Sequence, residues 1–391
     1  MASRRRQASL VSIVVLGTVI GTLAAAAPSG AVPLTITTVI SGLNTPRGVA
    51  FDGQGSLYVS ESGQAGAGPA GLTHTGRVSK FPRGSTSPAW QTSFESLYLT
   101  VDPSAPPDVL GPEGISAVGN GCMKNSGGQR NGCQVLMIMS ESHDGVAAES
   151  GGTIQTQQIG HLYRLDGATG TVTDRSNVGD QQYTWTGDHA SLFPDDFPDS
   201  NPYGVLVTKG LGGGVRTFVA DAGANTINEI MGDGTTRVIA YIPNETKVPF
   251  RDATPTCIAE GPDGMLYVAT LNFVANLFVY GFGQSNVWRG NPNANFPTVP
   301  TLWASGLITA TACTFDRADN FWAAEMFQPT GGAPGDVVRI PFNNPGQVER
   351  IGGGSLPLPG GIAQGPDGAM YVSVNSSSPV PNSGAIVKVS G

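Results

Sequence analysis

A short sequence unit that recurs six times constrains this chain more than any other feature. Its clearest copies span residues 46–61, 255–269 and 359–373. Each copy joins two apolar runs through a turn, and the Asp-Gly pairs at 52–53, 263–264 and 367–368 favour a tight hairpin because glycine adopts positive φ without steric cost. Weaker copies begin at Pro112, Pro202 and Thr311. A repeat of this kind indicates a ring or stack of similar units.

Each copy is followed by a third segment of alternating apolar residues, the pattern of a strand with one face in a core. These segments are 76–81, 160–165, 225–230, 276–280, 336–340 and 385–389. A fourth strand can be read in most copies, for example at 236–240. The last copy ends after its third strand, and the β-rich run at 35–40 would supply the missing fourth. Such pairing closes a ring and removes exposed sheet edges.

The sequence therefore predicts an all-β fold, a six-bladed β-propeller closed by the N-terminal strand pairing into the last blade. Glycine accounts for 55 of 391 residues and charged residues for only 13%, which agrees with short strands joined by tight turns. No long helical periodicity interrupts the pattern. Residues 32–391 are expected to form this single domain.

The first 31 residues have the organisation of a secretory signal peptide. Arg4, Arg5 and Arg6 form a basic head, an uncharged apolar run follows, and a stretch of small residues ends near Ala31. An uncleaved membrane anchor is the alternative. We expect cleavage and a secreted or cell-envelope location.

The charge balance restricts the partners. The net charge is −8, and removal of residues 1–31 takes away three arginines and no acid. An acidic chain lacks the basic face that nucleic acid requires, and it would not dock on an anionic membrane surface. The expected partner is a small molecule, a glycan or a protein, and the chain is expected to be a monomer.

The chain resembles the ScyD/ScyE family of secreted propellers. Its most specific segments are residues 198–206 and 219–225, and the opening segment 42–48 agrees as well. The Pro-Asp-Gly-x-Leu-Tyr-Val pattern is shared more widely with NHL-type propellers. The chain departs from the family between Cys122 and Cys133 and around residues 286–297. The resemblance implies an exported six-bladed propeller, and it supplies no catalytic residues.

One face of the predicted ring carries the long connections. Antiparallel strands alternate direction, so the second-to-third and fourth-to-first connections lie on the face where the inner strands begin. The long segments on that face are 62–75, 142–159, 176–201, 241–254 and 326–335. We expect a binding site on this loop-rich face, because function usually resides on loops that a rigid scaffold carries.

Four polar residues at the starts of inner strands are candidates for the rim of a central channel. They are Arg47, Glu113, Tyr203 and Thr256, and Ala312 and Gly360 take the same place in the other two copies. Arg47 and Glu113 come from neighbouring blades. They are interpreted either as a salt bridge that joins two blades, the commoner role of such pairs, or as a polar handle for a ligand.

Four carboxylates close second strands and form a second candidate set: Glu61, Glu141, Asp221 and Glu325. An acidic ring of this kind would suit Ca²⁺, which takes oxygen ligands, and would indicate a metal-assisted hydrolase or lactonase. The favoured alternative is that these acids cap turns, because second strands lie off the axis. No cofactor is assigned, and calcium is the metal that this set could bind.

The cysteines agree with an oxidising compartment. Cys122 and Cys133 flank a polar loop and are predicted to form a disulfide. Cys257 and Cys313 align at the same repeat position in adjacent copies. They are interpreted as small core residues rather than as a cross-blade disulfide, since their Cα atoms would lie far apart.

The four histidines, His74, His143, His161 and His189, lie in loops or in a third strand. A zinc-dependent lyase would need them on inner strands, so this function is disfavoured.

Three functions remain open. The favoured one is a non-catalytic scaffold that binds a ligand, glycan or protein on the loop-rich face. The alternatives are the calcium-assisted hydrolase and a structural protein of the cell wall or matrix. The sequence contains no nucleophile elbow and no phosphate-binding loop, so no catalytic residue is assigned.

Overall fold

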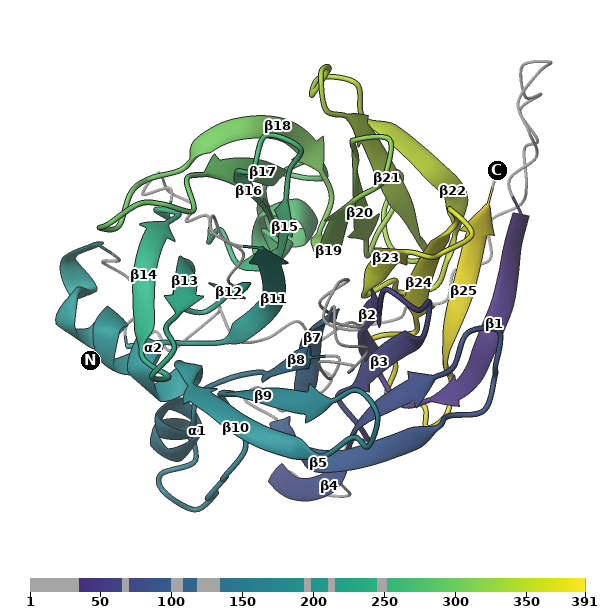
Figure 1. The fold of residues 1–391 in the computed structure, drawn as a ribbon. Helices are drawn as coiled ribbons and strands as arrows, with labels where there is room; N and C mark the ends of the chain where they lie inside the picture. The colour runs from purple at the N-terminus through teal and green to yellow at the C-terminus, as the bar shows by residue number, and fades with distance from the viewer. Residues whose placement is uncertain are drawn as a thin grey trace, which may run out of the picture.

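The structure is a computed structural model that describes residues 35–64, 70–99, 108–117, 134–192, 198–209, 215–244 and 252–390. Six antiparallel sheets are arranged around a central axis, each with its first strand innermost (Figure 1). The predicted six-bladed propeller is confirmed. The predicted signal peptide and the predicted Cys122–Cys133 disulfide lie outside the described residues, and both stay predictions.

The first three blades are built as follows. Blade one contains β2 (Pro46–Phe51), β3 (Leu57–Glu61), β4 (Ala70–Phe81), β5 (Trp90–Leu99) and a short fifth strand, β6 (Asp108–Leu110). Blade two contains β7 (Pro112–Ala117), β8 (Gln134–Met139), β9 (His161–Asp166) and β10 (Val172–Asn177). Blade three contains β11 (Pro202–Lys209), β12 (Val215–Asp221), β13 (Thr226–Ile230) and β14 (Thr236–Tyr241).

The last three blades complete the ring. Blade four contains β15 (Pro255–Glu260), β16 (Leu266–Thr270), β17 (Ser285–Gly290) and β18 (Thr301–Leu307). Blade five contains β19 (Ala310–Phe315), β20 (Asn320–Glu325), β21 (Gly335–Pro341) and β22 (Glu349–Leu356). Blade six contains β23 (Ile362–Gln364), β24 (Met370–Val374) and β25 (Gly384–Ser390), and β1 (Thr35–Leu43) pairs with β25 as its outer strand. The predicted closure by the N-terminal strand is therefore confirmed.

The prediction of a third strand at 276–280 was wrong. These residues lie in a π-helical turn, η2 (Ala275–Val279), and the third strand is β17. The buried Asn276 amide explains the difference. Its nitrogen donates to the Asn272 carbonyl at 3.0 Å, and its oxygen accepts the Gly283 and Gln284 N–H groups at 3.0 and 2.9 Å. The side chain thus satisfies backbone groups that a strand ladder would otherwise need.

Two of the predicted loops contain helices. α1 (His143–Glu149) follows β8, and α2 (Val178–Asp188) with the 3₁₀ turn η1 (Ala190–Leu192) follows β10. Ser142 caps α1 by accepting the Gly145 N–H at 3.0 Å, and Asn177 caps α2 by accepting the Asp180 N–H at 3.1 Å. Such caps satisfy N–H groups that have no partner inside the helix.

The Asp-Gly turns carry a recurring contact. Asp263 accepts the Tyr267 hydroxyl at 3.1 Å, and Asp367 accepts the Tyr371 hydroxyl at 3.1 Å. Gly264 and Gly368 have φ of +71° and +88°, which explains why glycine follows the aspartate. The carboxylate therefore fixes both the turn and the aromatic ring of the second residue in the next strand.

Glycine sets how closely the inner strands approach. A Cβ atom on Gly114 would lie 2.5 Å from the Tyr203 carbonyl oxygen of the next blade, and one on Gly204 would lie 2.8 Å from that of Thr256. Gly48 and Gly361 have the same close approach to their following blades. Side chains at this register position therefore point toward the next blade in the ring.

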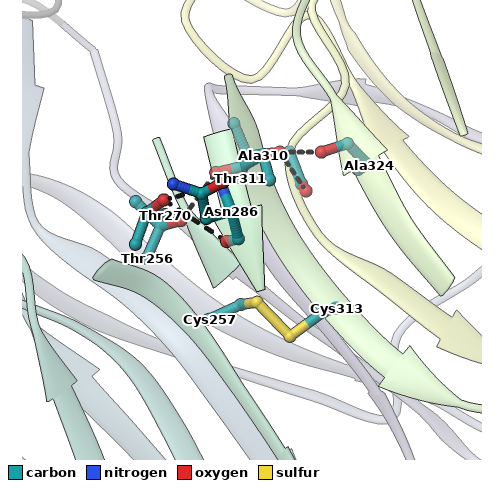
Figure 2. Close-up of a disulfide and its surroundings, with 9 residues drawn as sticks. Thr256, Cys257, Thr270, Asn286, Ala310, Thr311, Cys313 and Ala324 are labelled. Atoms are coloured by element: carbon teal, nitrogen blue, oxygen red, sulfur yellow. Dashed lines mark hydrogen bonds between the residues drawn. A yellow bond between two sulfur atoms is a disulfide. The ribbon is translucent and has the colours of Figure 1, made fainter. Parts of the chain in front are cut away.

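The boundary between blades four and five is different, because a disulfide joins Cys257 to Cys313 (Figure 2). The interpretation of these cysteines as unbonded core residues was wrong. Their Cα atoms are 5.6 Å apart, an ordinary distance for a disulfide.

Strand register explains how the two sulfur atoms meet. Cys257 pairs with Ala269, as Gly204 pairs with Ala220, whereas Ala312 takes this place in blade five and Cys313 is one residue further along. Because successive strand residues point to opposite faces, Cys257 points toward blade five and Cys313 points back toward blade four. Cysteines at the same position, as the alignment of copies suggested, would both point the same way around the ring.

Candidate functional site

One cavity of about 390 Å³ follows the axis of the ring and is lined by residues of all six blades. A volume of this size is typical of small-molecule pockets. Its middle is apolar, because the same register position carries Val49, Ile115, Val205, Ile258 and Ile362, with Cys313 in the sixth blade. This apolar belt lies between two mouths that both carry charged side chains.

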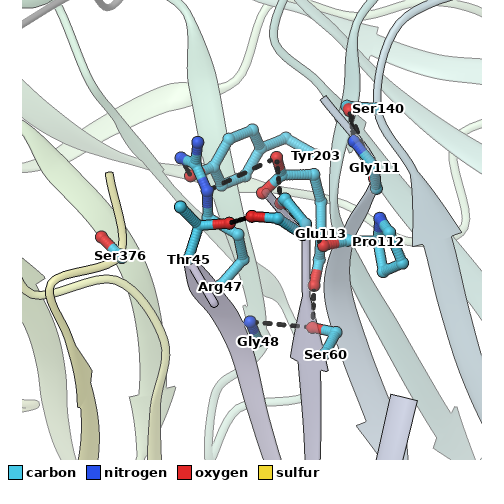
Figure 3. Close-up of polar contacts among 12 residues, drawn as sticks. Thr45, Arg47, Gly48, Ser60, Gly111, Pro112, Glu113, Ser140, Tyr203 and Ser376 are labelled. Carbon is cyan, nitrogen blue, oxygen red and sulfur yellow. Dashed lines mark hydrogen bonds and ion pairs between the residues drawn. The ribbon is translucent and has the colours of Figure 1, made fainter. Parts of the chain in front are cut away.

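Three long polar side chains meet at the mouth on the loop-rich face (Figure 3). Arg47, Glu113 and Tyr203 come from β2, β7 and β11, the inner strands of three consecutive blades. Arg47 Nη1 donates to the Tyr203 hydroxyl at 3.3 Å, and Arg47 Nε lies 3.7 Å from Glu113 Oε1. The side chains of Arg47 and Glu113 are 5% and 2% exposed. The two charges therefore form the predicted inter-blade salt bridge and also line the cavity.

Hydroxyl groups fix the strands that carry this cluster. Ser62 Oγ lies 3.0 Å from the Pro112 carbonyl oxygen and 3.3 Å from Glu113 Oε1. Ser60 accepts the Gly48 N–H at 2.9 Å and donates to the Glu113 carbonyl. The backbone on both sides of the salt bridge is therefore tied across the boundary between blades one and two.

The other half of the mouth is made of smaller residues. Thr256 lines the cavity, and its hydroxyl donates to the Ala310 carbonyl at 2.6 Å, which links blade four to blade five. Thr311 and Ala312 follow in blade five, and Gly361, rather than Gly360, lines the cavity in blade six. The mouth is lopsided: hydrogen-bonding side chains project from one half, and small side chains line the other.

The acidic set does not reach the channel, since none of its four members lines the cavity. Glu61 accepts the Asn44 N–H at 2.8 Å, Asp221 accepts that of Asn201 at 2.8 Å, and Glu325 accepts that of Ile308 at 2.7 Å. In blades one and five, the residue after the N–H donor has a left-handed conformation: Thr45 has a φ of 42° and Thr309 a φ of 45°. These carboxylates accept a backbone N–H from the segment that leads into each inner strand, which is the turn-capping role.

Glu141 is not equivalent to the other three acids. Pro112 pairs with Met139, whereas Pro46 pairs with Glu61, so Glu141 lies two residues beyond the shared position. Its own N–H donates to Asn201 Oδ1 at 3.1 Å, and its φ is 61°. The spacing of sequence copies could not reveal this offset, because it depends on strand register.

Burial changes the proton affinity of two of these acids. It raises the pKa of Glu325 from its ordinary value of 4.5 to about 7, although Arg350 lowers it by an ion pair at 2.8 Å. Burial also raises the pKa of Asp221, against the lowering effect of its hydrogen bonds from Ala224, Ser200, Asn201 and Gly223. Both groups belong to turns of the scaffold, so these shifts concern stability rather than the channel.

The histidines lie away from the channel. His143 Nδ1 is 3.1 Å from the Thr156 hydroxyl, His161 is 2.8 Å from Asp174, and His189 stacks on Trp185. Within the described ranges, no three His, Cys, Asp or Glu side chains form a group that could hold a metal ion. No helix in this part of the chain is long and apolar enough to cross a membrane.

Sequence reasoning missed the residues of the opposite mouth. Phe51, Glu260, Phe315, Arg317 and Gln364 line the cavity at the ends of inner strands, away from the long loops. Their signal in the sequence is a position, two or more residues after the aliphatic belt in each copy. That position becomes visible only when the register of every inner strand is known.

Comparisons with known proteins support the fold. No protein-family model matches the chain, and no curated protein matches its sequence. The soluble aldose sugar dehydrogenase of Escherichia coli in its apo-form is similar with a TM-score of 0.51 and 13% identity over 92% of this chain and 99% of that chain. A Bacteroides thetaiotaomicron protein of unknown function has a TM-score of 0.51 and 11% identity over 92% and 76%.

Virginiamycin B lyase from Staphylococcus aureus is also similar, with a TM-score of 0.43 and 13% identity over 92% of this chain and 100% of that chain. At these identities the likeness concerns the β-propeller fold alone.

Proposed function

We propose that this protein is an exported propeller scaffold of the ScyD/ScyE type that binds a small polyhydroxylated ligand, such as a short glycan, at the mouth formed by Arg47, Glu113 and Tyr203. The observation that carries the proposal is the convergence of these three polar side chains, from three consecutive blades, on one mouth of a 390 Å³ cavity. The cross-blade disulfide supports export, because disulfides persist in oxidising compartments.

The chemistry of the mouth favours an uncharged ligand. Arg47 and Glu113 neutralise each other across 3.7 Å, so neither an anion nor a cation gains a net attraction. A ligand with several hydroxyl groups can donate to the carboxylate and accept from the guanidinium at once, and such charge-assisted hydrogen bonds are strong. Tyr203 and Thr256 add further polar groups on the same rim.

The lopsided shape favours the same class of ligand. In blades four to six the mouth is lined by the small residues Thr256, Thr311 and Gly361. In blades one to three, long side chains project into the mouth. A ring-shaped ligand can therefore lie against the small side chains of blades four to six with its hydroxyl groups toward Arg47. The scaffold is proposed to be non-catalytic, because its strongly buried carboxylates serve turns and blade boundaries.

Calorimetric titration with maltotriose, cellotriose and chitotriose tests the proposal. We expect saturable binding of at least one trisaccharide, and we expect Tyr203→Phe to weaken it at least threefold by removing one hydroxyl group. Tyr371→Phe is the matched control, because it deletes the same group on an Asp-Gly turn away from the channel. Absence of saturable binding, or equal binding by wild type and Tyr203→Phe, would overturn the proposal.

A further inference from the structure

The mouth at the far end of the inner strands carries two charged groups that the proposed function does not use. Glu260 ends β15 in blade four, and Arg317 follows β19 in blade five; both are exposed and both line the cavity. β15 and β19 lie side by side next to the channel (Figure 1). One acid and one base therefore flank the same opening on adjacent blades.

These two charges are held apart. The Thr208 hydroxyl of blade three donates to the Glu260 carboxylate, and Arg317 Nη2 donates to the Gly365 carbonyl of blade six at 3.2 Å. Neither residue forms an ion pair with any other residue that the structure describes. At the first mouth, by contrast, Arg47 and Glu113 face each other. The adjacent Asp316 carboxylate is taken up by its own turn, where it accepts the Trp322 Nε1–H at 2.8 Å.

Two half-buried aromatic rings complete this mouth. Phe51 and Phe315 line the same end of the cavity from blades one and five. Phe51 packs edge-on against Tyr371 at 4.9 Å, and Phe315 packs edge-on against Tyr267 at 5.1 Å. These contacts hold the rings in place, so their remaining exposed surface offers a fixed apolar contact to a ligand.

We propose that this second mouth binds a zwitterion with an apolar side group, that is, a free apolar α-amino acid. Glu260 receives the ammonium group, Arg317 receives the carboxylate, and the side chain packs against Phe315 and Phe51. Only a ligand with both charges satisfies both residues, and charge-assisted hydrogen bonds of this kind are the stronger ones in proteins. Burial of the ligand's apolar group adds a contribution that scales with the area removed from water.

Titration with four related ligands tests the proposal directly. L-leucine carries both charges, N-acetyl-L-leucine lacks the ammonium group, L-leucinamide lacks the carboxylate, and glycine lacks the side chain. We expect saturable calorimetric binding of L-leucine and at least fivefold weaker binding of each of the other three. The proposal would be overturned if L-leucine showed no saturable binding. It would also be overturned if N-acetyl-L-leucine and L-leucinamide bound as tightly as L-leucine.

Variants assign each charge to its partner. Glu260→Gln should weaken L-leucine binding at least fivefold and should leave N-acetyl-L-leucine unaffected, since the lost contact is one that this ligand never makes. Arg317→Gln should likewise weaken L-leucine binding at least fivefold and leave L-leucinamide binding unaffected, because L-leucinamide has no carboxylate for Arg317 to bind. Both residues are exposed, so both variants should fold. Arg339→Gln is the matched control, because Arg339 pairs with Glu349 away from the channel.

This inference is independent of the glycan proposal, because the two mouths share no side chain. Tyr203→Phe must leave L-leucine binding unchanged, and Arg317→Gln must leave trisaccharide binding unchanged. If Tyr203→Phe abolished L-leucine binding, the amino acid would occupy the first mouth and the assignment to Glu260 and Arg317 would be wrong.

Discussion

Two boundaries between blades solve the same packing problem with different chemistry. Where blade six meets blade one, Gly361 approaches the backbone of β2, and Ser373 accepts the Gly361 N–H at 2.7 Å and donates to the Arg47 carbonyl at 3.4 Å. Where blade four meets blade five, Cys257 replaces the glycine, Ala269 replaces the serine, and the disulfide to Cys313 spans the gap.

The comparison shows that close approach of inner strands can be secured without a covalent bond. A glycine and a serine hydroxyl also join blade one to blade two, through Gly48 and Ser60. The serine hydroxyl accepts a hydrogen bond from one buried N–H and donates to one buried carbonyl. Leaving these two backbone groups without partners would lower stability. The disulfide achieves closure by constraining the unfolded chain instead.

Removal of the disulfide should have the largest effect on stability. The two cysteines are 56 residues apart, and a closed loop of that length contributes about 4 kcal/mol in the chain-entropy account. We expect Cys257→Ala/Cys313→Ala to lower the free energy of unfolding by an amount of this order, measured by urea denaturation. Reduction of the wild-type protein should lower its free energy of unfolding by the same amount as the double substitution. Such agreement would confirm that the disulfide itself is responsible.

A second double variant sharpens this test. Cys257→Gly/Cys313→Val rebuilds the pattern of Gly204 and Val205, and adding Ala269→Ser supplies the bridging hydroxyl. We expect the triple variant to be more stable than the double alanine variant. If it were not, the glycine and serine boundary would depend on features that blades four and five lack.

The glycine boundary should tolerate a methyl group poorly. A Cβ on Gly114 would lie 2.5 Å from the Tyr203 carbonyl oxygen and 2.9 Å from the Val205 nitrogen, both backbone atoms. Gly114→Ala should therefore cost about 3 kcal/mol, since overpacking forces backbone to move. Gly232→Ala is the control, because a Cβ there meets no atom within 4 Å. Equal melting temperatures for the two variants would contradict this account of the boundary.

Glu325 should make stability depend on pH. Burial raises its pKa from 4.5 to about 7, so between these pH values the folded protein holds a proton that the unfolded chain has released. The free energy of unfolding should therefore fall as pH rises through this window, by at most about 3 kcal/mol. Glu325→Gln should remove this contribution in denaturation measured at pH 5 and pH 8. Glu349→Gln is the control, because Glu349 pairs with Arg339 near the surface, away from the inner strands.

Much of the fold could be predicted from the sequence, because strand alternation and Asp-Gly turns are local features. Ring closure was also readable, since the missing outer strand of the last copy has a matching run at residues 35–40. The strand error at 276–280 arose because the Asn276 side chain bonds to backbone on both sides of the turn, a contact that no apolar pattern reveals.

The site was less predictable, because it depends on register and burial. Arg47, Glu113, Tyr203 and Thr256 do line the cavity as expected, since they start inner strands. The cysteine alignment was off by one residue, because Ala310, and not Thr311, takes the place of Pro255 in blade five. Ala312 is therefore the counterpart of Cys257, and Cys313 lies on the other face of β19. Glu260 and Arg317 lie at the opposite ends of the inner strands, away from the long loops, and only the register of these strands places them in the cavity wall.

The smallest effect should come from the hydroxyl that joins blades one and two. Ser60→Ala removes the acceptor of the Gly48 N–H and a donor to the Glu113 carbonyl, and we expect a loss of about 1–2 kcal/mol. Ser85→Ala is the matched control, because Ser85 makes only exposed turn contacts. Because Glu113 carries the salt bridge at the mouth, Ser60→Ala should also weaken trisaccharide binding. A stability loss without any change in binding would show that the boundary and the site are separable.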